Sequence, residues 1–116
     1  MSNNKKNKLH VCSLDVLRQK TTMSWNKMVQ DQQKACLIIY IDEQLYTYVN
    51  SCPHTGVNLD WKPHEFLSND GLYIQCAMHG ALFNIKNGLC LHGPCLGEGL
   101  EPIKSEIIDG QIYVYL

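Results

Sequence analysis

The sequence lacks any apolar stretch long enough to act as a signal peptide or a membrane anchor. Its longest apolar run, residues 35–41, has seven residues, whereas a helix needs about 20 apolar residues to span a bilayer. A run of this length suits a buried strand instead. We therefore expect a cytoplasmic protein that does not associate with a membrane.

The sequence also lacks a strong charge of either sign. Its net charge is −1 at pH 7, and its one basic cluster, Lys5, Lys6 and Lys8, sits in an Asn-rich tail. We read this tail as solvated and expect no nucleic-acid partner. Without repeats, 116 residues allow one modest core. We expect a flexible tail over residues 1–8 and a single domain over residues 9–116.

A helical period sustained over three turns is absent as well, whereas strand patterns are frequent. Residues 13–15 suggest a turn or a single helical turn, and Asp109-Gly110 is a strong hairpin signal. Strands are predicted at residues 9–12, 21–28, 35–41, 44–49, 103–108 and 111–116. The sequence therefore predicts an all-β fold.

Cysteine and histidine, by contrast, are concentrated in one region. Four of the six cysteines and four of the five histidines lie between residues 50 and 102, among glycines and prolines. In a reducing compartment, such cysteines indicate metal binding or buried packing before they indicate disulfides. We expect a site built from loops on a β scaffold.

Two short motifs carry the chemistry: Cys52-Pro53-His54-Thr55-Gly56 and Cys76-Ala77-Met78-His79-Gly80. Each offers one thiolate and one imidazole, and the glycine lets backbone amides approach an anionic inorganic core. Three interpretations remain open at this point. The residues are unrelated, they form a zinc site with two cysteines and two histidines, or they hold a two-iron cluster, with cysteines on one iron and histidines on the other.

The spacing C-x-H in one loop and C-x-x-H in a second resembles the signature of the Rieske iron–sulfur domain family, and the similarity covers nearly the whole chain. The resemblance implies one [2Fe–2S] cluster per chain. It implies that Cys52 and Cys76 bind the inner iron, and that His54 and His79 bind the outer iron.

The resemblance further implies stacked antiparallel sheets, with the cluster bound by a loop-built part at about residues 50–95. Gly93-Pro94 falls where the family has a third, proline-containing loop that shields the cluster.

Several positions depart from the Rieske proteins of respiratory and photosynthetic complexes. Val57 and Met78 stand where those proteins have a pair of disulfide-bonded cysteines. Ala81 and Phe83 stand where they have a serine and a tyrosine that donate hydrogen bonds to sulfur. Both departures are typical of the soluble, low-potential class associated with oxygenases.

The segment between the two motifs is longer than the family usually has, and we place the excess at residues 60–67. We interpret it as a surface loop that Trp61 and Phe66 pin to the body, the alternative being an edge where a partner docks.

The remaining cysteines and histidines receive structural interpretations. Cys12 and Cys36 are predicted to fill the core. Cys90 and Cys95 flank the third loop, and we expect buried, inert thiols there, with redox activity as the alternative. His10, His64 and His92 belong to no ligand motif, and none of them is assigned to the cluster.

A Rieske cluster exchanges one electron, and an oxygenase needs a further mononuclear iron in a separate domain. We therefore expect an electron carrier rather than an enzyme: a soluble ferredoxin between a flavin reductase and an oxygenase or other acceptor. The alternatives are a small Rieske-fold subunit of a multisubunit reductase, such as nitrite reductase, and a zinc-stabilised binding module.

Overall fold

The computed structural model describes residues 7–53, 56, 58–59, 64–76 and 80–116. In chain order the elements of these residues are β1 (Lys8–Ser13), α1 (Leu14–Lys20), β2 (Thr22–Val29), β3 (Gln32–Ile41), β4 (Gln44–Val49), β5 (Tyr73–Gln75), β6 (Leu82–Asn84), β7 (Cys90–His92), β8 (Ser105–Ile108) and β9 (Gln111–Tyr115).

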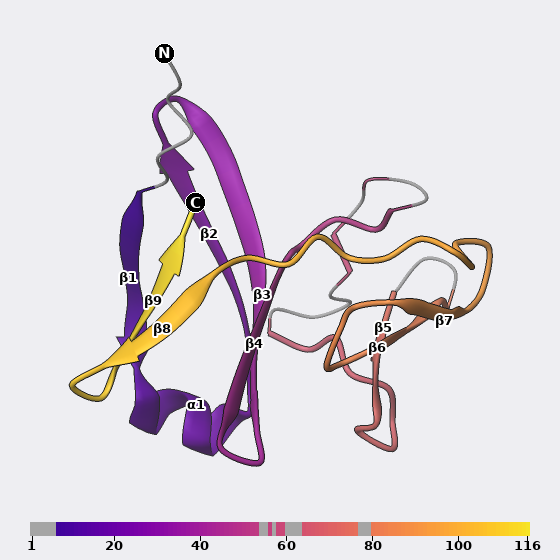
Figure 1. The fold of residues 1–116 in the computed structure, drawn as a ribbon, viewed down its shortest axis with the longest axis horizontal. Helices are drawn as coiled ribbons and strands as arrows, with labels where there is room; N and C mark the ends of the chain where they lie inside the picture. The colour runs from indigo at the N-terminus through magenta and orange to yellow at the C-terminus, as the bar shows by residue number, and fades with distance from the viewer. Residues whose placement is uncertain (1–6, 54–55, 57, 60–63, 77–79) are drawn as a thin grey trace.

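The strands form three antiparallel sheets of three strands each. Their orders are β1-β9-β8, β2-β3-β4 and β5-β6-β7. The first two sheets form the body, and the small third sheet stands to one side of it (Figure 1). The predicted all-β fold of stacked antiparallel sheets is confirmed.

The strongest local signals in the sequence correspond to observed elements. β3 and β4 contain the predicted strands 35–41 and 44–49. β8 and β9 meet at Asp109 and Gly110, whose φ angles are 51° and 74°. A two-residue hairpin turn of this kind needs positive φ at both central positions, and aspartate followed by glycine supplies it at low cost.

Helix α1 is longer than the single turn that the sequence suggested. Its two turns are stabilised by Leu17, which is wholly buried in one core with Cys36 and Ile38. Asp15 in the first turn and Arg18 in the last turn also match the helix dipole. A helix of seven residues is too short to show a period in the sequence.

Strand β3 is buried on both faces, as its continuous apolar run predicted. Cys36 and Ile38 point into the core between the two sheets of the body. Leu37 and Ile39 point into a second core that the third sheet and the motif loops share. Side chains alternate along a strand, so one strand serves both cores.

The third sheet meets the body at Tyr48 in β4. The Tyr48 hydroxyl donates a hydrogen bond to the carbonyl of Ile85 at 2.5 Å. Gly88 has a φ of 75°, and a Cβ at this position would lie 2.8 Å from Cε1 of Tyr48 and 3.3 Å from Cβ of Leu100. Glycine is therefore required here both for its backbone conformation and for the space it leaves to the tyrosine ring.

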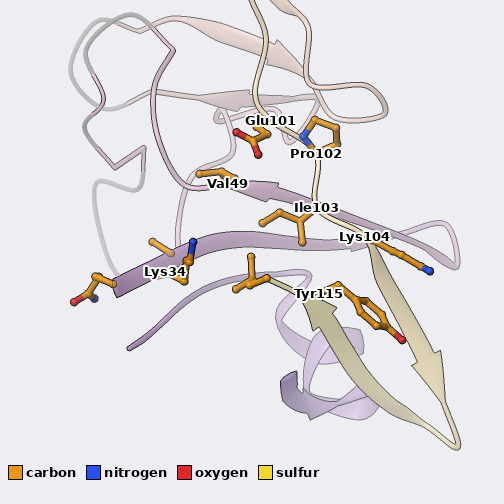
Figure 2. A pocket seen from close by; sticks show the side chains of 10 residues that line it. Lys34, Val49, Glu101, Pro102, Ile103, Lys104 and Tyr115 are labelled. Atoms are coloured by element: carbon orange, nitrogen blue, oxygen red, sulfur yellow. The ribbon is translucent and has the colours of Figure 1, made fainter. Parts of the chain in front are cut away.

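The chain returns from the third sheet along β4. Val49 N donates to Glu101 O at 2.8 Å, and Ile103 N donates to Thr47 O at 2.9 Å. Where residues 101–104 pass towards β8, they border a groove of about 440 Å³ (Figure 2). Among the described residues that line this groove, none belongs to the two motif loops.

Within the part of the chain that the structure describes, no helix has the length and apolar character needed to cross a membrane.

The joint at Gly88 yields a stability prediction. Gly88→Ala should lower the free energy of unfolding by roughly 2–5 kcal/mol, because left-handed backbone costs about 1–2 kcal/mol with a side chain and overpacking adds about 1–3 kcal/mol. Gly110→Ala is the matched control: Gly110 has a φ of 74° but nothing within 4 Å. Gly110→Ala should lower the free energy of unfolding only by the cost of the left-handed backbone, about 1–2 kcal/mol. Denaturant unfolding measures both, and equal losses would contradict the contact with Tyr48.

Candidate metal centre

The two motif cysteines lie deep in the protein. Cys52 is 2% exposed and Cys76 is wholly buried, and both belong to the core that the third sheet shares with β3. The structure thus brings the two predicted thiolate ligands into one packed cluster. His54 and His79 lie outside the described residues, as do Val57, Trp61 and Met78.

Both motif loops close with the same backbone turn. Gly56 N donates to Cys52 O at 2.7 Å, and Gly80 N donates to Cys76 O at 3.0 Å. The φ angles of the two glycines are 79° and 64°. A Cβ would meet nothing within 4 Å at Gly56 and only the end of the Gln75 side chain at Gly80. Each motif therefore needs its glycine for the left-handed conformation that closes the loop.

The first loop starts from β4 and is braced by Asn50. The backbone N–H of Asn50 donates to Ala35 O in β3 at 2.9 Å. Its buried side-chain oxygen accepts a hydrogen bond from Leu59 N at 2.7 Å. Asn50 thus connects β3 to the far end of the loop that carries Cys52.

The second loop lies between the paired strands β5 and β6. Cys76 N donates to Ala81 O at 2.9 Å, which continues the pairing of these strands beyond Gln75 and Leu82. Cys76 therefore occupies the end of a hydrogen-bonded hairpin, and rigid elements hold it from both sides.

The third loop packs directly on the second. Gly93 has a φ of 112°, and a Cβ there would lie 3.0 Å from both Cα and Cβ of Ala81. The predicted shielding loop, Gly93-Pro94, therefore lies beside the residue that follows the second motif.

Three of the other four cysteines are buried as expected. Cys90 and Cys95 belong to the same core as Cys52, and the Cys90 thiol donates to the carbonyl of His92 at 3.5 Å. Burial, together with a hydrogen bond to Cys90, raises the pKa of Cys95 to about 12. Burial likewise raises the pKa of Cys36 to about 12. Thiols of this kind are protonated at neutral pH and react poorly. Cys12 is half-buried and packs against the other core.

The segment between the motifs is joined to the body. Phe66 is wholly buried in the core that contains Cys52 and Cys76, which confirms the predicted pinning for this residue. His64, to which the sequence gave no role, is hydrogen-bonded to β2 through Ser24. No sequence signal could have found this pairing, because the two residues are 40 positions apart.

The described residues supply two cysteine ligands, which suit an iron–sulfur cluster, but they do not form a complete metal site by themselves. Among those residues, no group of three or more histidines, cysteines, aspartates or glutamates lies close enough to hold a metal ion. What they provide is two buried sulfurs on matching loops, in a core that excludes water. Soft thiolates in such surroundings are suited to iron–sulfur chemistry, and each motif adds one histidine beyond the described part.

Comparison with known proteins adds independent information. The chain matches the family described as Rieske [2Fe–2S] domain over residues 7–112. No curated protein matches it.

Among solved structures, the chain is similar to a complex of reduced oxygenase and oxidised ferredoxin in carbazole 1,9a-dioxygenase, with a TM-score of 0.72, 23% identity and coverage of 93% of this chain and 92% of that one. It is also similar to the ferredoxin of carbazole 1,9a-dioxygenase from Nocardioides aromaticivorans IC177, with a TM-score of 0.72, 19% identity and coverage of 93% and 96%.

A third similar structure is the Sphingomonas yanoikuyae B1 ferredoxin, with a TM-score of 0.65, 22% identity and coverage of 95% and 99%. At these identities the likeness supports the fold. The family match spans nearly all of the chain, and the chain therefore belongs to the Rieske [2Fe–2S] domain family, whose cofactor is a [2Fe–2S] cluster.

Proposed function

We propose that the protein is a small ferredoxin that carries one electron at a time from a flavin reductase to an oxygenase or another acceptor. The observation that carries this proposal is the extent of the structural match. Ferredoxins from two organisms are covered over 96% and 99% of their own chains, and this chain over 93% and 95%. Nearly all of the chain is thus accounted for by a fold that serves a carrier.

The cluster would be held by Cys52 and Cys76 on its inner iron and by His54 and His79 on its outer iron. This assignment is supported by the burial of both cysteines and by the corresponding hydrogen bonds from Gly56 and Gly80 to the two cysteine carbonyls. Cysteine thiolate is the ligand that Fe–S clusters use, and histidine on one iron is the mark of the Rieske type.

The surrounding residues would exclude water and set the potential of the cluster. The cluster supplies a single reversible electron, while the protein supplies burial and hydrogen bonding. Ala81 and Phe83 are wholly buried in the core that contains both cysteines, and neither side chain can donate a hydrogen bond. A reduced, more negative cluster would therefore be stabilised less than in proteins with hydroxyl groups at these positions. For this reason we expect a reduction potential at the low end of the family's range.

The ligand assignment predicts the outcome of four substitutions. Cys52→Ser and Cys76→Ser should each abolish the visible spectrum and the content of about two irons and two acid-labile sulfides per chain, because a hydroxyl replaces a soft thiolate poorly. Cys36→Ala, a buried cysteine of the other core, and His92→Ala, an exposed histidine, should retain both. Loss of the spectrum in the His92 variant would contradict the assignment.

The missing donors predict a shift in potential. We expect about −150 mV for the protein. Ala81→Ser combined with Phe83→Tyr should add two donors, each favouring the reduced state by roughly 1 kcal/mol. Since about 1.4 kcal/mol corresponds to about 59 mV for one electron, voltammetry should show a rise on the order of 80 mV. An intact cluster with no shift would mean that these side chains do not face sulfur.

The carrier role is tested by electron transfer with partners from its own host. Tagged protein should copurify with a flavin reductase or a Rieske oxygenase. Mixed without oxygen and with a limiting amount of reduced nicotinamide as the electron donor, the reductase should bleach the oxidised protein. Oxidised oxygenase, added next, should accept the electron and restore the colour. The Cys76→Ser variant is the control without a cluster. Copurification with a sirohaem reductase, and no exchange with an oxygenase, would favour a reductase subunit instead.

A further inference from the structure

His64 is fastened to strand β2 by three hydrogen bonds. Ser24 N donates to Nδ1 of the imidazole at 3.1 Å, and His64 N donates to Ser24 Oγ at 3.0 Å. The Thr22 hydroxyl donates to the carbonyl of His64 at 2.6 Å. The side chain, the backbone amide and the backbone carbonyl of one residue are all engaged with one strand.

The backbone conformation and the hydrogen bonds at position 64 limit which residues can replace histidine there. Its φ is 69°, a left-handed value that histidine and asparagine tolerate better than most residues. The bond from Ser24 N requires an acceptor attached to Cγ, which the imidazole provides when its proton is on Nε2. Asparagine has an acceptor oxygen on the same carbon. Alanine has none and is strained at this φ.

The segment that follows His64 leads directly to the second motif. Gln75 N donates to Phe66 O at 2.8 Å, and Leu67 forms a bridge with Ile74. Strand β5 pairs with β6 on one side only. Residues 66–67 pair with its other side, which would otherwise be a free sheet edge. Gln75 is the last residue of β5 and immediately precedes Cys76.

These contacts connect β2 in the body to a cluster cysteine. We propose that His64 is a positioning residue for the second cluster loop: it fixes residues 64–67 on β2, and this fixed segment holds β5, and through it Cys76, in place. The part of this proposal that concerns the cluster depends on Cys76 being a ligand. The part that concerns β5 does not.

Two readouts separate positioning from general stability. Hydrogen exchange of the Gln75 amide, measured on the cluster-loaded protein, reports opening of its bond to Phe66. The rate at which a chelator bleaches the cluster reports how firmly the second loop holds it. The variants are His64→Ala and His64→Asn, with His92→Ala as the matched control, since His92 is an exposed histidine in the third sheet.

We expect His64→Ala to purify with its full iron content, and to show about five- to thirtyfold faster exchange at Gln75 and faster bleaching by a similar factor. The substitution removes the bond from Ser24 N to the imidazole, and it strains the left-handed backbone that makes the other two bonds. His64→Asn should restore both rates to within about twofold of the unmodified protein, because it keeps the acceptor. His92→Ala should leave both rates unchanged.

Unchanged exchange at Gln75 in His64→Ala would overturn the proposal, as would an asparagine variant as fast as the alanine variant. If His64→Ala does not fold, Thr22→Val takes its place: it removes the donor to the His64 carbonyl and should accelerate exchange by about fivefold. Faster exchange without faster bleaching would overturn the link to the cluster. A failure of the ligand assignment is distinguishable, because Cys76→Ser would then keep its spectrum.

Discussion

The double burial of strand β3 is the constraint on which the rest of the structure depends. Cys36 and Ile38 pack on one side with helix α1, and Leu37 and Ile39 pack on the other with Cys52 and Cys76. Because a strand presents alternate residues to opposite faces, the body and the loops that contain Cys52 and Cys76 pack on opposite faces of the same strand. The third sheet is too small to bury a hydrophobic core by itself, and its core is completed by packing against β3.

The cluster loops are positioned by backbone hydrogen bonds rather than by bulky side chains. The carbonyls of the two cysteines accept corresponding hydrogen bonds from Gly56 and Gly80, and the third loop packs on Ala81 at Gly93, which has no side chain. Gly56 and Gly80 supply the positive φ that lets each loop fold back on its cysteine, and Gly93 leaves the space that lets the third loop approach Ala81. Backbone contacts of this kind hold Cys52 and Cys76 in place, as a preorganised ligand site would require.

Besides the shared core, three polar side chains connect the third sheet and the loops beside it to the body. Tyr48 reaches from β4 to Ile85, Asn50 bridges β3 and the first loop, and His64 bridges β2 and the edge of β5. Each uses a polar group whose partner is a buried or half-buried backbone atom, and such groups are costly to leave unpaired. They set the orientation of the cluster loops relative to the body.

The sequence by itself determined the strands of the body, the hairpin at Asp109-Gly110 and the two cysteines that the structure buries together, because side-chain alternation, turn chemistry and ligand spacing are local properties. It did not predict the short strands β6 and β7 of the third sheet. It did not determine the second turn of α1, which depends on a place for Leu17 in a core formed by distant strands. Nor did it indicate the fit of Gly88 against Tyr48 or the pairing of His64 with Ser24. These contacts join residues 40 positions apart in both cases, and only the packing of one sheet on another brings them together.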